Sequence, residues 1–340
     1  MLFQSKIINV MKTKKITYSI ICLLVGGYMT SCNMGPVPLP YAHGNAGDVL
    51  VVMSEHLWKG AYGDSVRNYL TEPVSGLPVP EPMFTLSQIN ELSKLVQKFR
   101  NIVIVNIDPG YERAKLGLKS DVYAKNQLIF NIDAPLADSA IACMYKNKDV
   151  IIARILAKDR DAIINDYKRS VAKPVVDKLR EKYQVDIVIP NPYTLDVEKE
   201  DIVWIAREEG ERQWGILMWE EPYTSKDQLE TDNLILKMNA MTRKIVSGKI
   251  AGSYMADEPM VPPVVKRFEK DGVYAVQMNG SWQMENDFLG GPYISQTIVD
   301  VERGKLVTAH GFVFYPNREK RQMVRQLEAI LYTMMPAEEI

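Results

Sequence analysis

The strongest constraint on this chain is a short hydrophobic stretch near its N-terminus that ends in a cysteine. A basic segment over residues 12–15 precedes an uncharged, mostly apolar run over residues 16–28, and Thr30, Ser31 and Cys32 follow soon after. This order of basic, apolar and small residues is typical of a secretory signal peptide. The apolar run is shorter than the roughly 20 residues that a helix needs to cross a bilayer. We therefore expect residues 1–31 to be removed as a leader.

Cys32 makes a second prediction possible. The segment Met29-Thr30-Ser31-Cys32 resembles a bacterial lipobox, in which the cysteine thiol takes a diacylglyceryl group and becomes the new N-terminus, although Met29 stands where leucine is usual. Acyl chains contribute about 0.8 kcal/mol of membrane affinity per buried CH₂ group, so several chains anchor a protein firmly. We predict lipidation of Cys32 with fatty acids such as palmitate. The alternatives are an ordinary signal peptide followed by an incidental cysteine, and an anchor that is not cleaved.

Composition limits the class of partner. Removal of the leader leaves 309 of the 340 residues, enough for one large domain or two small ones. The leader contains four lysines and no acidic residue, so its loss takes the formal net charge from −1 to −5. No run of Lys and Arg is long enough to indicate a nucleic-acid surface. We predict that the chain does not bind nucleic acid.

Proline-rich segments divide the mature chain. Residues 32–47 are rich in Pro and Gly and predict a tether, and no acidic cluster follows Cys32. We therefore expect a membrane lipoprotein of the cell envelope whose body faces the periplasm. Pro190 and Pro192 interrupt the pattern again. We predict an N-terminal half over residues 48–190 and a C-terminal half over residues 201–335.

Hydrophobic periodicity predicts both strands and helices in each half. In the first half we expect strands over 49–53, 101–107, 126–132 and 185–189, and helices up to residue 70, over 87–99 and over 148–183, with a restart at Pro174. In the second half we expect a hairpin over 201–219, a helix over 234–245, strands over 273–278, 293–301 and 306–314, and a final helix from about residue 317. The pattern predicts an α+β fold of two similar-sized halves, with mostly antiparallel sheets and helices packed on one side.

Two strands of the first half end alike. Asn106-Ile107-Asp108 and Asn131-Ile132-Asp133 each close a predicted strand just before a proline. Two carboxylates at one sheet edge can share general acid and base work when their pKa values differ. Asp residues before a proline also stabilise turns without any catalytic role. We regard turn stabilisation by Asp108 and Asp133 as the simpler interpretation.

The segment over residues 282–293 is the leading candidate for binding. It combines aromatic, acidic and flexible residues between two predicted strands, and the ones we select are Trp282, Asp287, Gly290, Gly291 and Tyr293. Loops on a rigid sheet often carry binding residues, and glycine lets a ligand approach the backbone. The alternative is a long turn whose aromatic residues close the end of the sheet. The proline-rich loop over residues 71–82 is a second candidate surface.

Other chemistry finds little support in the sequence. The three histidines, His43, His56 and His310, lack the spacing of a zinc site, and Cys143 is the only cysteine left after the leader and Cys32. The chain also lacks the glycine-rich loops and nucleophile motifs of common enzyme families. We predict no metal site and no cofactor.

Several strings of the mature chain are similar to an uncharacterised family of Bacteroidota lipoproteins, known only as a domain of unknown function. They are Gly76-Leu77-Pro78-Val79-Pro80-Glu81-Pro82, Asp287-Phe288-Leu289-Gly290-Gly291-Pro292, Gly311-Phe312-Val313 and Arg325-Gln326-Leu327-Glu328-Ala329-Ile330-Leu331. The resemblance implies an envelope location and an α+β body, and it transfers no catalytic residue.

Together these features predict a membrane-anchored envelope lipoprotein that acts as a non-catalytic binding or assembly module. Its partner would be an envelope protein, a peptide or a glycan. The alternative is a hydrolase of envelope polymers, acting on glycan or peptide through carboxylates such as Asp108 and Asp133.

Overall fold

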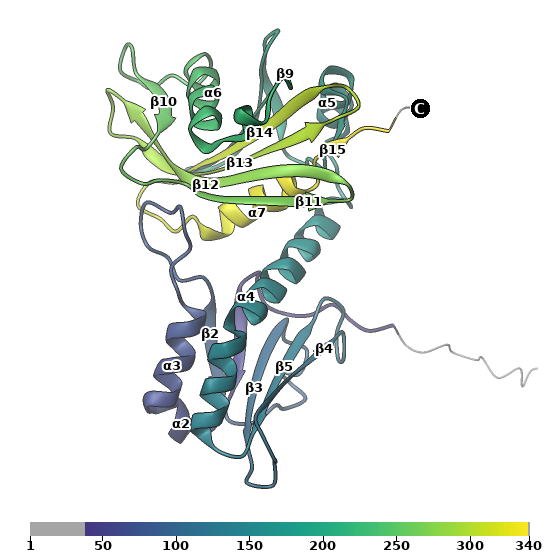
Figure 1. The fold of residues 1–340 in the computed structure, drawn as a ribbon, viewed down its shortest axis with the longest axis vertical. Helices are drawn as coiled ribbons and strands as arrows, with labels where there is room; N and C mark the ends of the chain where they lie inside the picture. The colour runs from purple at the N-terminus through teal and green to yellow at the C-terminus, as the bar shows by residue number, and fades with distance from the viewer. Residues whose placement is uncertain (1–37, 339–340) are drawn as a thin grey trace, which may run out of the picture. The chain divides into compact units, whose positions relative to one another are not determined.

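The structure is a computed structural model that describes residues 38–338 (Figure 1). The leader and Cys32 lie outside the described residues. From Pro40 onward the chain forms one unit built on two successive β-sheets. We call residues 42–168 the N-terminal lobe and residues 172–338 the C-terminal lobe. Within the described residues, none of the helices is long and apolar enough to cross a bilayer.

The N-terminal lobe is built on a five-stranded sheet with the order β2-β1-β3-β5-β4. Its strands are β1 (Asp48–Val52), β2 (Thr85–Ile89), β3 (Asn101–Ile107), β4 (Lys115–Ser120) and β5 (Leu128–Ala134). Strands β1, β2, β3 and β5 run parallel, and only β4 is antiparallel to its neighbour. The central strands are nearly continuous apolar runs, as expected for parallel strands that are buried on both faces.

Helices cover one face of this sheet. They are α2 (Glu55–Lys59), α3 (Ala61–Leu70) and the long α4 (Ala137–Tyr167). Val103 and Val105 of β3 pack with Met144, Ile151 and other apolar residues in one core. The second face of the sheet has its own small core around Ile102 and Ile129.

The predicted helix over residues 87–99 is wrong. Thr85–Ile89 is the edge strand β2, and residues 90–99 form turns. The periodic apolar residues Leu92, Val96 and Phe99 pack instead on the second face of the sheet. A helix of this length is marginal by itself, so pairing with β1 and burial against the sheet decide the local structure.

The C-terminal lobe is built on an antiparallel eight-stranded sheet with the order β10-β12-β13-β14-β9-β8-β7, and β11 also pairs with β12. Its strands are β7 (Thr194–Glu198), β8 (Val203–Glu209), β9 (Arg212–Pro222), β10 (Tyr254–Asp257), β11 (Val264–Lys270), β12 (Val273–Glu285), β13 (Gly290–Asp300) and β14 (Lys305–Phe314). The short strands β6 (Val185–Asp186) and β15 (Met335–Pro336) pair with each other.

Helices cover both faces of the eight-stranded sheet. Figure 1 shows α6 (Thr231–Arg243) on one face and α7 (Arg321–Tyr332) on the other. The α7 face also carries α5 (Lys173–Tyr183), whereas the α6 face also carries a short 3₁₀ helix (Lys226–Leu229). The α+β class with two halves is confirmed, and the helices of this lobe extend to a second side of the sheet.

Pro174 marks a helix restart, as predicted. α4 ends at Tyr167, and α5 begins at Lys173 with Pro174 in its first turn. A proline is tolerated there because the first N–H groups of a helix have no partner within it. Val175 and Leu179 of α5 pack into the core of the C-terminal sheet. The predicted division of the chain at residues 190–200 stays a prediction.

Candidate functional site

The predicted binding segment over residues 282–293 forms the ends of β12 and β13 and the turn between them. Trp282 and Tyr293 are buried in the core under α6. The Trp282 Nε1–H donates to the Val313 carbonyl at 3.3 Å, and the Tyr293 hydroxyl donates to Asp257 Oδ1 at 2.6 Å. Burial, and then the hydrogen bond to Asp257, raise the pKa of Tyr293. Both aromatic residues therefore serve the core.

Gly291 is required by close packing within the sheet. A Cβ atom there would lie 2.2 Å from the Val313 carbonyl oxygen and 2.9 Å from Trp282 Nε1. The space that glycine leaves is therefore occupied by the protein's own backbone and indole. The predicted role of Gly291 in ligand approach gains no support from this arrangement.

The turn itself presents a hydrophobic side chain to solvent. Asp287 is half-buried, and its Oδ1 accepts a hydrogen bond from the Phe288 N–H at 2.7 Å. Phe288 is fully exposed, and Gly290 beside it is also exposed. We call residues 286–290 the hairpin tip. Of the residues predicted here, Asp287 and Gly290 belong to this tip.

The proline-rich loop over residues 71–82 reaches from the N-terminal lobe to the C-terminal lobe. The Ser281 hydroxyl of β12 donates to the Gly76 carbonyl at 3.2 Å. Glu81 is buried, and its two carboxyl oxygens accept the backbone N–H groups of Lys320 and Arg321 at 2.7 and 2.9 Å. A carboxylate from the other lobe therefore caps the N-terminus of α7, where N–H groups have no partner within the helix.

One groove brings the two predicted loops together. It has a volume of about 650 Å³ and lies between the proline-rich loop, the hairpin tip and the segment before α7. Its apolar walls include Pro78, Val79, Pro80, Phe288, Leu289 and Phe314. Val79 is 62% exposed, so both loops contribute hydrophobic surface that no described residue covers. We call this feature the proline groove.

The lining of the proline groove is mostly apolar, with few polar groups. Among the described residues that line it, none is Ser, Thr, Cys, His or Tyr. Glu81 is engaged by the backbone of α7, and the Lys320 ammonium donates to the Arg318 carbonyl at 2.7 Å. Glu319 is the other carboxylate of the lining, and it is exposed at the rim before α7.

The two aspartates of the alternative prediction end neighbouring strands. Strands β3 and β5 pair in register, with Asn106 opposite Asp133. The Asn106 amide donates to Asp133 Oδ1 at 3.0 Å, and Asp108 Oδ1 accepts the Gly110 N–H at 2.8 Å. Desolvation raises the pKa of the Tyr111 phenol, and the charges of Asp133 and Asp108 raise it further. Each carboxylate thus has a local structural partner, and catalysis by them stays a prediction.

Other residues considered in the sequence have structural surroundings. Cys143 on α4 is half-buried, and burial raises the pKa of its thiol, which lowers the thiolate fraction. His310 is fully buried among aromatic rings. Among the residues that the structure describes, no group of three or more His, Cys, Asp or Glu could hold a metal ion.

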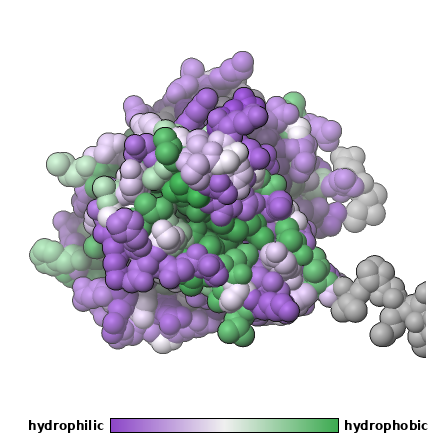
Figure 2. Space-filling view, turned by 90° about the horizontal axis from the view of Figure 1, so that it is seen from below, coloured by the Kyte–Doolittle hydropathy of each residue, from purple (hydrophilic) through white to green (hydrophobic). Residues whose placement is uncertain are grey.

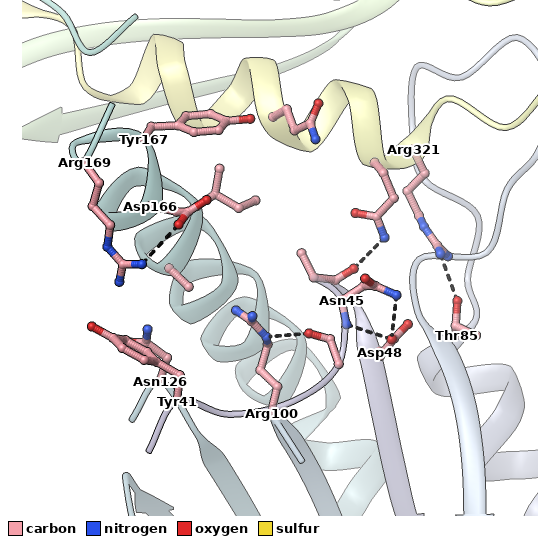
Figure 3. Close-up of a pocket in the computed structure, with 16 residues that line it drawn as sticks. Tyr41, Asn45, Asp48, Thr85, Arg100, Asn126, Asp166, Tyr167, Arg169 and Arg321 are labelled. Atoms are coloured by element: carbon pink, nitrogen blue, oxygen red, sulfur yellow. Dashed lines mark hydrogen bonds and ion pairs between the residues drawn. The ribbon is translucent and has the colours of Figure 1, made fainter. Parts of the chain in front are cut away.

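A second cavity, of about 840 Å³, was not predicted (Figure 3). Its polar lining includes Tyr41, Arg100, Arg169 and Arg321. These residues come from segments far apart in the sequence and share no motif. Only the fold brings them together, and no local pattern in the sequence marks them.

Comparison with protein families finds two adjoining matches. Residues 42–168 match a domain of unknown function (DUF8532), and residues 172–333 match another domain of unknown function (DUF4837). The predicted resemblance to a domain of unknown function is confirmed at this level, and its lineage and lipoprotein parts stay predictions. No curated protein sequence matches the chain.

Solved structures give only low similarity. A structure of LpqN, described as involved in cell envelope biogenesis of Mycobacterium tuberculosis, is 13% identical with a TM-score of 0.28, covering 45% of this chain and 83% of that one. A protein from Bacteroides thetaiotaomicron is 12% identical with a TM-score of 0.21, covering 46% and 47%. Human StAR-related lipid transfer protein 5 is 11% identical with a TM-score of 0.24, covering 53% and 96%. At these TM-scores the likenesses carry no functional argument.

Proposed function

We propose that this chain is a membrane-anchored binding protein of the cell envelope and that the proline groove receives its partner. One observation carries the proposal: two loops about 200 residues apart in sequence line the same groove with uncovered hydrophobic side chains. Exposed apolar surface of this kind is costly in a soluble protein and often marks an interaction site. The proposed function is binding without catalysis.

The lining of the groove favours an extended peptide segment as the ligand. Aromatic and proline side chains form shallow apolar grooves that dock polyproline II segments of partner proteins. Trp282 and Tyr293, the aromatic residues of the 282–293 segment that could stack on a glycan together with Phe288, are buried in the core. We therefore propose a proline-containing or otherwise extended apolar segment of another envelope protein.

The anchor and location complete the proposal. A lipid on Cys32, joined to the body through a proline- and glycine-rich tether, would hold the groove near the membrane on its periplasmic side. Metabolic labelling with palmitate tests this part. We expect label on the wild-type chain and none on a Cys32→Ser variant, and an unlabelled wild-type chain would contradict lipidation.

The binding proposal is tested by substitution in the groove. Phe288→Ser should reduce recovery of crosslinked partners from native envelopes by more than about tenfold, because a central aromatic anchor often carries around 2 kcal/mol or more of binding energy. Val79→Ser should reduce it less. Val301→Ser is the matched control, because Val301 is 78% exposed and lies in the β13–β14 turn.

The melting temperature separates binding from folding in this test. Phe288 is fully exposed, so its replacement should leave the melting temperature unchanged. Partner recovery that is equal for the wild type and the Phe288→Ser and Val79→Ser variants would rule out the groove as the binding site.

The second candidate function is hydrolysis of envelope polymers. It is favoured by one observation, the adjacency of the strand ends that carry Asp108 and Asp133 beside the Tyr111 phenol. Under this hypothesis, Asp108→Asn and Asp133→Asn would each abolish release of fragments from purified envelope glycan or peptide. Absence of fragment release by the wild-type chain would exclude it.

A further inference from the structure

The second cavity lies at the junction of the two lobes and shares none of its described lining residues with the proline groove, although Arg321 lines the cavity and its neighbour Lys320 lines the groove. Its walls come from the start of β1, the C-terminal end of α4 and the N-terminal half of α7 (Figure 3). Its volume of about 840 Å³ falls within the range of pockets that hold small organic ligands. Three guanidinium groups and two carboxylates line it.

Arg100 has donors that the protein does not use. Its side chain is only 18% exposed. Its Nε–H donates to the Gly44 carbonyl at 3.3 Å, and Nη1 lies 3.9 Å from Asp159 Oδ1, too far for a hydrogen bond. Among the described residues, no hydrogen bond engages either terminal nitrogen of Arg100. A largely buried guanidinium with free terminal N–H groups is a ready donor to an oxyanion.

Arg321 adds positive charge to the same cavity. It is 7% exposed. Its Nη2–H donates to the Thr85 hydroxyl at 2.9 Å, its Nη1–H donates to the Pro82 carbonyl, and its Nε–H is buried without a partner. No side-chain ion pair involving Arg321 occurs within the described residues. In the part of the chain that the structure describes, the side chain of Arg321 is hydrogen-bonded only to neutral acceptors, while the Glu81 carboxylate binds its backbone N–H. A buried guanidinium is costly without a counter-charge, and a bound anion would add one.

The acidic groups of the cavity are already engaged. Asp48 Oδ2 accepts hydrogen bonds from the backbone N–H and side-chain amide of Asn45 at 2.8 and 3.2 Å. Asp166 pairs with Arg169 at 3.3 Å. Asp159, buried behind the cavity, accepts from the Gly47 N–H at 2.6 Å. Asp159 also forms an ion pair with Arg100 at 3.9 Å, so it balances the charge of Arg100 without using the terminal N–H donors of that guanidinium. The lining therefore has spare hydrogen-bond donors and three guanidinium groups against two carboxylates.

Aromatic side chains complete the walls. Tyr41 lies beneath Arg169, whose Cζ is 5.0 Å from the ring centre. Burial raises the pKa of Tyr167 to about 12, so its hydroxyl remains a hydrogen-bond donor at neutral pH. These rings can pack against the carbon skeleton of a ligand while the arginines bind its charged group.

We propose that this cavity binds a small organic anion, and that the terminal nitrogens of Arg100 donate to its carboxylate or phosphate group while Arg321 supplies further positive charge. The planar guanidinium fork suits both oxyanions. This site is separate from the proline groove and does not depend on the proposed peptide partner.

Isothermal titration of the full chain in detergent tests the proposal, with citrate and inorganic phosphate as probes and glycerol as the neutral comparison. We expect millimolar or tighter binding of at least one anion and no heat from glycerol. Stronger binding of citrate would indicate a carboxylate ligand, and stronger binding of phosphate a phosphorylated one. Absence of anion binding at roughly 10 mM, or equal binding of glycerol, would overturn the proposal.

Three variants locate the site. Arg100→Lys should weaken anion binding by about tenfold, because a lysine keeps the charge and loses the planar fork. Arg169→Gln should weaken it by about fivefold, since it leaves Asp166 as an unpaired anion in the cavity. Arg113→Gln is the control, because Arg113 is exposed in the β3–β4 segment.

The melting temperatures of these variants keep the test decisive. Arg169 is more than half exposed, so Arg169→Gln should fold normally even if Arg100→Lys does not. Anion affinity that is equal in the wild type, Arg169→Gln and Arg113→Gln would show that binding occurs elsewhere and would overturn the assignment.

Discussion

The two sheets of this protein differ in how completely they are covered. The eight-stranded sheet is buried on both faces, by α5 and α7 on one side and α6 on the other. The five-stranded sheet is covered by α3 and α4 on one face and by the non-helical residues 90–99 on the other. Asn106 on that second face is exposed and Asn131 is half-exposed. The C-terminal sheet is therefore the more tightly constrained platform.

The N-terminal lobe, whose sheet has helices on one face only, exposes hydrophobic surface. Figure 2, an end view of this lobe, shows a hollowed hydrophobic area with a hydrophilic border. Large exposed hydrophobic side chains of the lobe include Leu118, Leu136 and Tyr145, which are 42, 64 and 59% exposed. Loops and helix ends line both candidate sites, and neither site lies on the face of a sheet.

The largest expected change in stability comes from replacing a glycine in the eight-stranded sheet, and a glycine in the five-stranded sheet serves for comparison. Gly215 of β9 lies opposite Phe312 of β14, and a Cβ atom there would be 2.2 Å from the phenyl ring. Gly215→Ala should lower the free energy of unfolding by about 3 kcal/mol, because the ring packs against two tryptophans and has little room to move.

Gly117 of β4 provides the matched control. A Cβ atom at Gly117 would be 3.8 Å from its nearest neighbour, so Gly117→Ala should leave stability unchanged or slightly improved. Urea denaturation measures both variants. Equal effects of the two substitutions would contradict the difference in packing between the sheets.

The next effect concerns the connection between the lobes. Glu81→Gln should lower the free energy of unfolding by about 2–3 kcal/mol, because two hydrogen bonds from the N-terminus of α7 to a buried carboxylate are weakened. Glu91→Gln, at an exposed position, should have no measurable effect. Similar denaturation midpoints for Glu81→Gln and the wild type would show that the cap contributes little.

The stability of the protein should depend on pH through His310, which is buried in the C-terminal sheet. Burial lowers the pKa of His310 from 6.5 to about 3. Between these values the unfolded chain binds one more proton than the folded chain, so this contribution to stability is complete above about pH 6.5 and is lost as the pH falls toward 3. The expected loss from His310 at pH 5 is about 2 kcal/mol.

Replacement of His310 tests this assignment. His310→Leu should remove that part of the acid sensitivity, whereas His56→Leu, at an exposed position, should retain it. Thermal unfolding between pH 7.5 and pH 4 provides the measurement. Parallel acid profiles for the wild type and His310→Leu would contradict burial of the neutral imidazole.

Much of the fold followed from local patterns in the sequence. The apolar run at 101–107 is strand β3, the strand predicted over 126–132 is found two residues later as β5, Pro174 restarts a helix, and the hairpin around Gly210 is present. The periodicity over 87–99 was misleading, because apolar residues spaced four apart can cover a sheet face without forming a helix. Continuous apolar runs are typical of buried parallel strands, but the order and pairing of β1, β2, β3 and β5 depend on contacts between residues far apart in the sequence.

The sequence predicted the two loops of the candidate site but not that they lie side by side. The sequence singled out residues 71–82 and 282–293 separately, and composition drew attention to Trp282 and Tyr293, which serve the core. The groove arises because Glu81 caps α7 from the other lobe and brings the proline-rich loop beside the hairpin tip. No local sequence pattern predicts this cap, because the Glu81 carboxylate lies about 240 residues before the N–H groups that it binds.

The central claim is that the groove between the proline-rich loop and the hairpin tip holds a partner. Site-specific photocrosslinking in native envelopes tests it most directly, with a photoreactive phenylalanine placed at position 288 and, as a control, at position 301. We predict a discrete crosslinked product from position 288 alone. Identical products from both positions, or no product from 288 in cells that contain the lipid-anchored chain, would contradict the account.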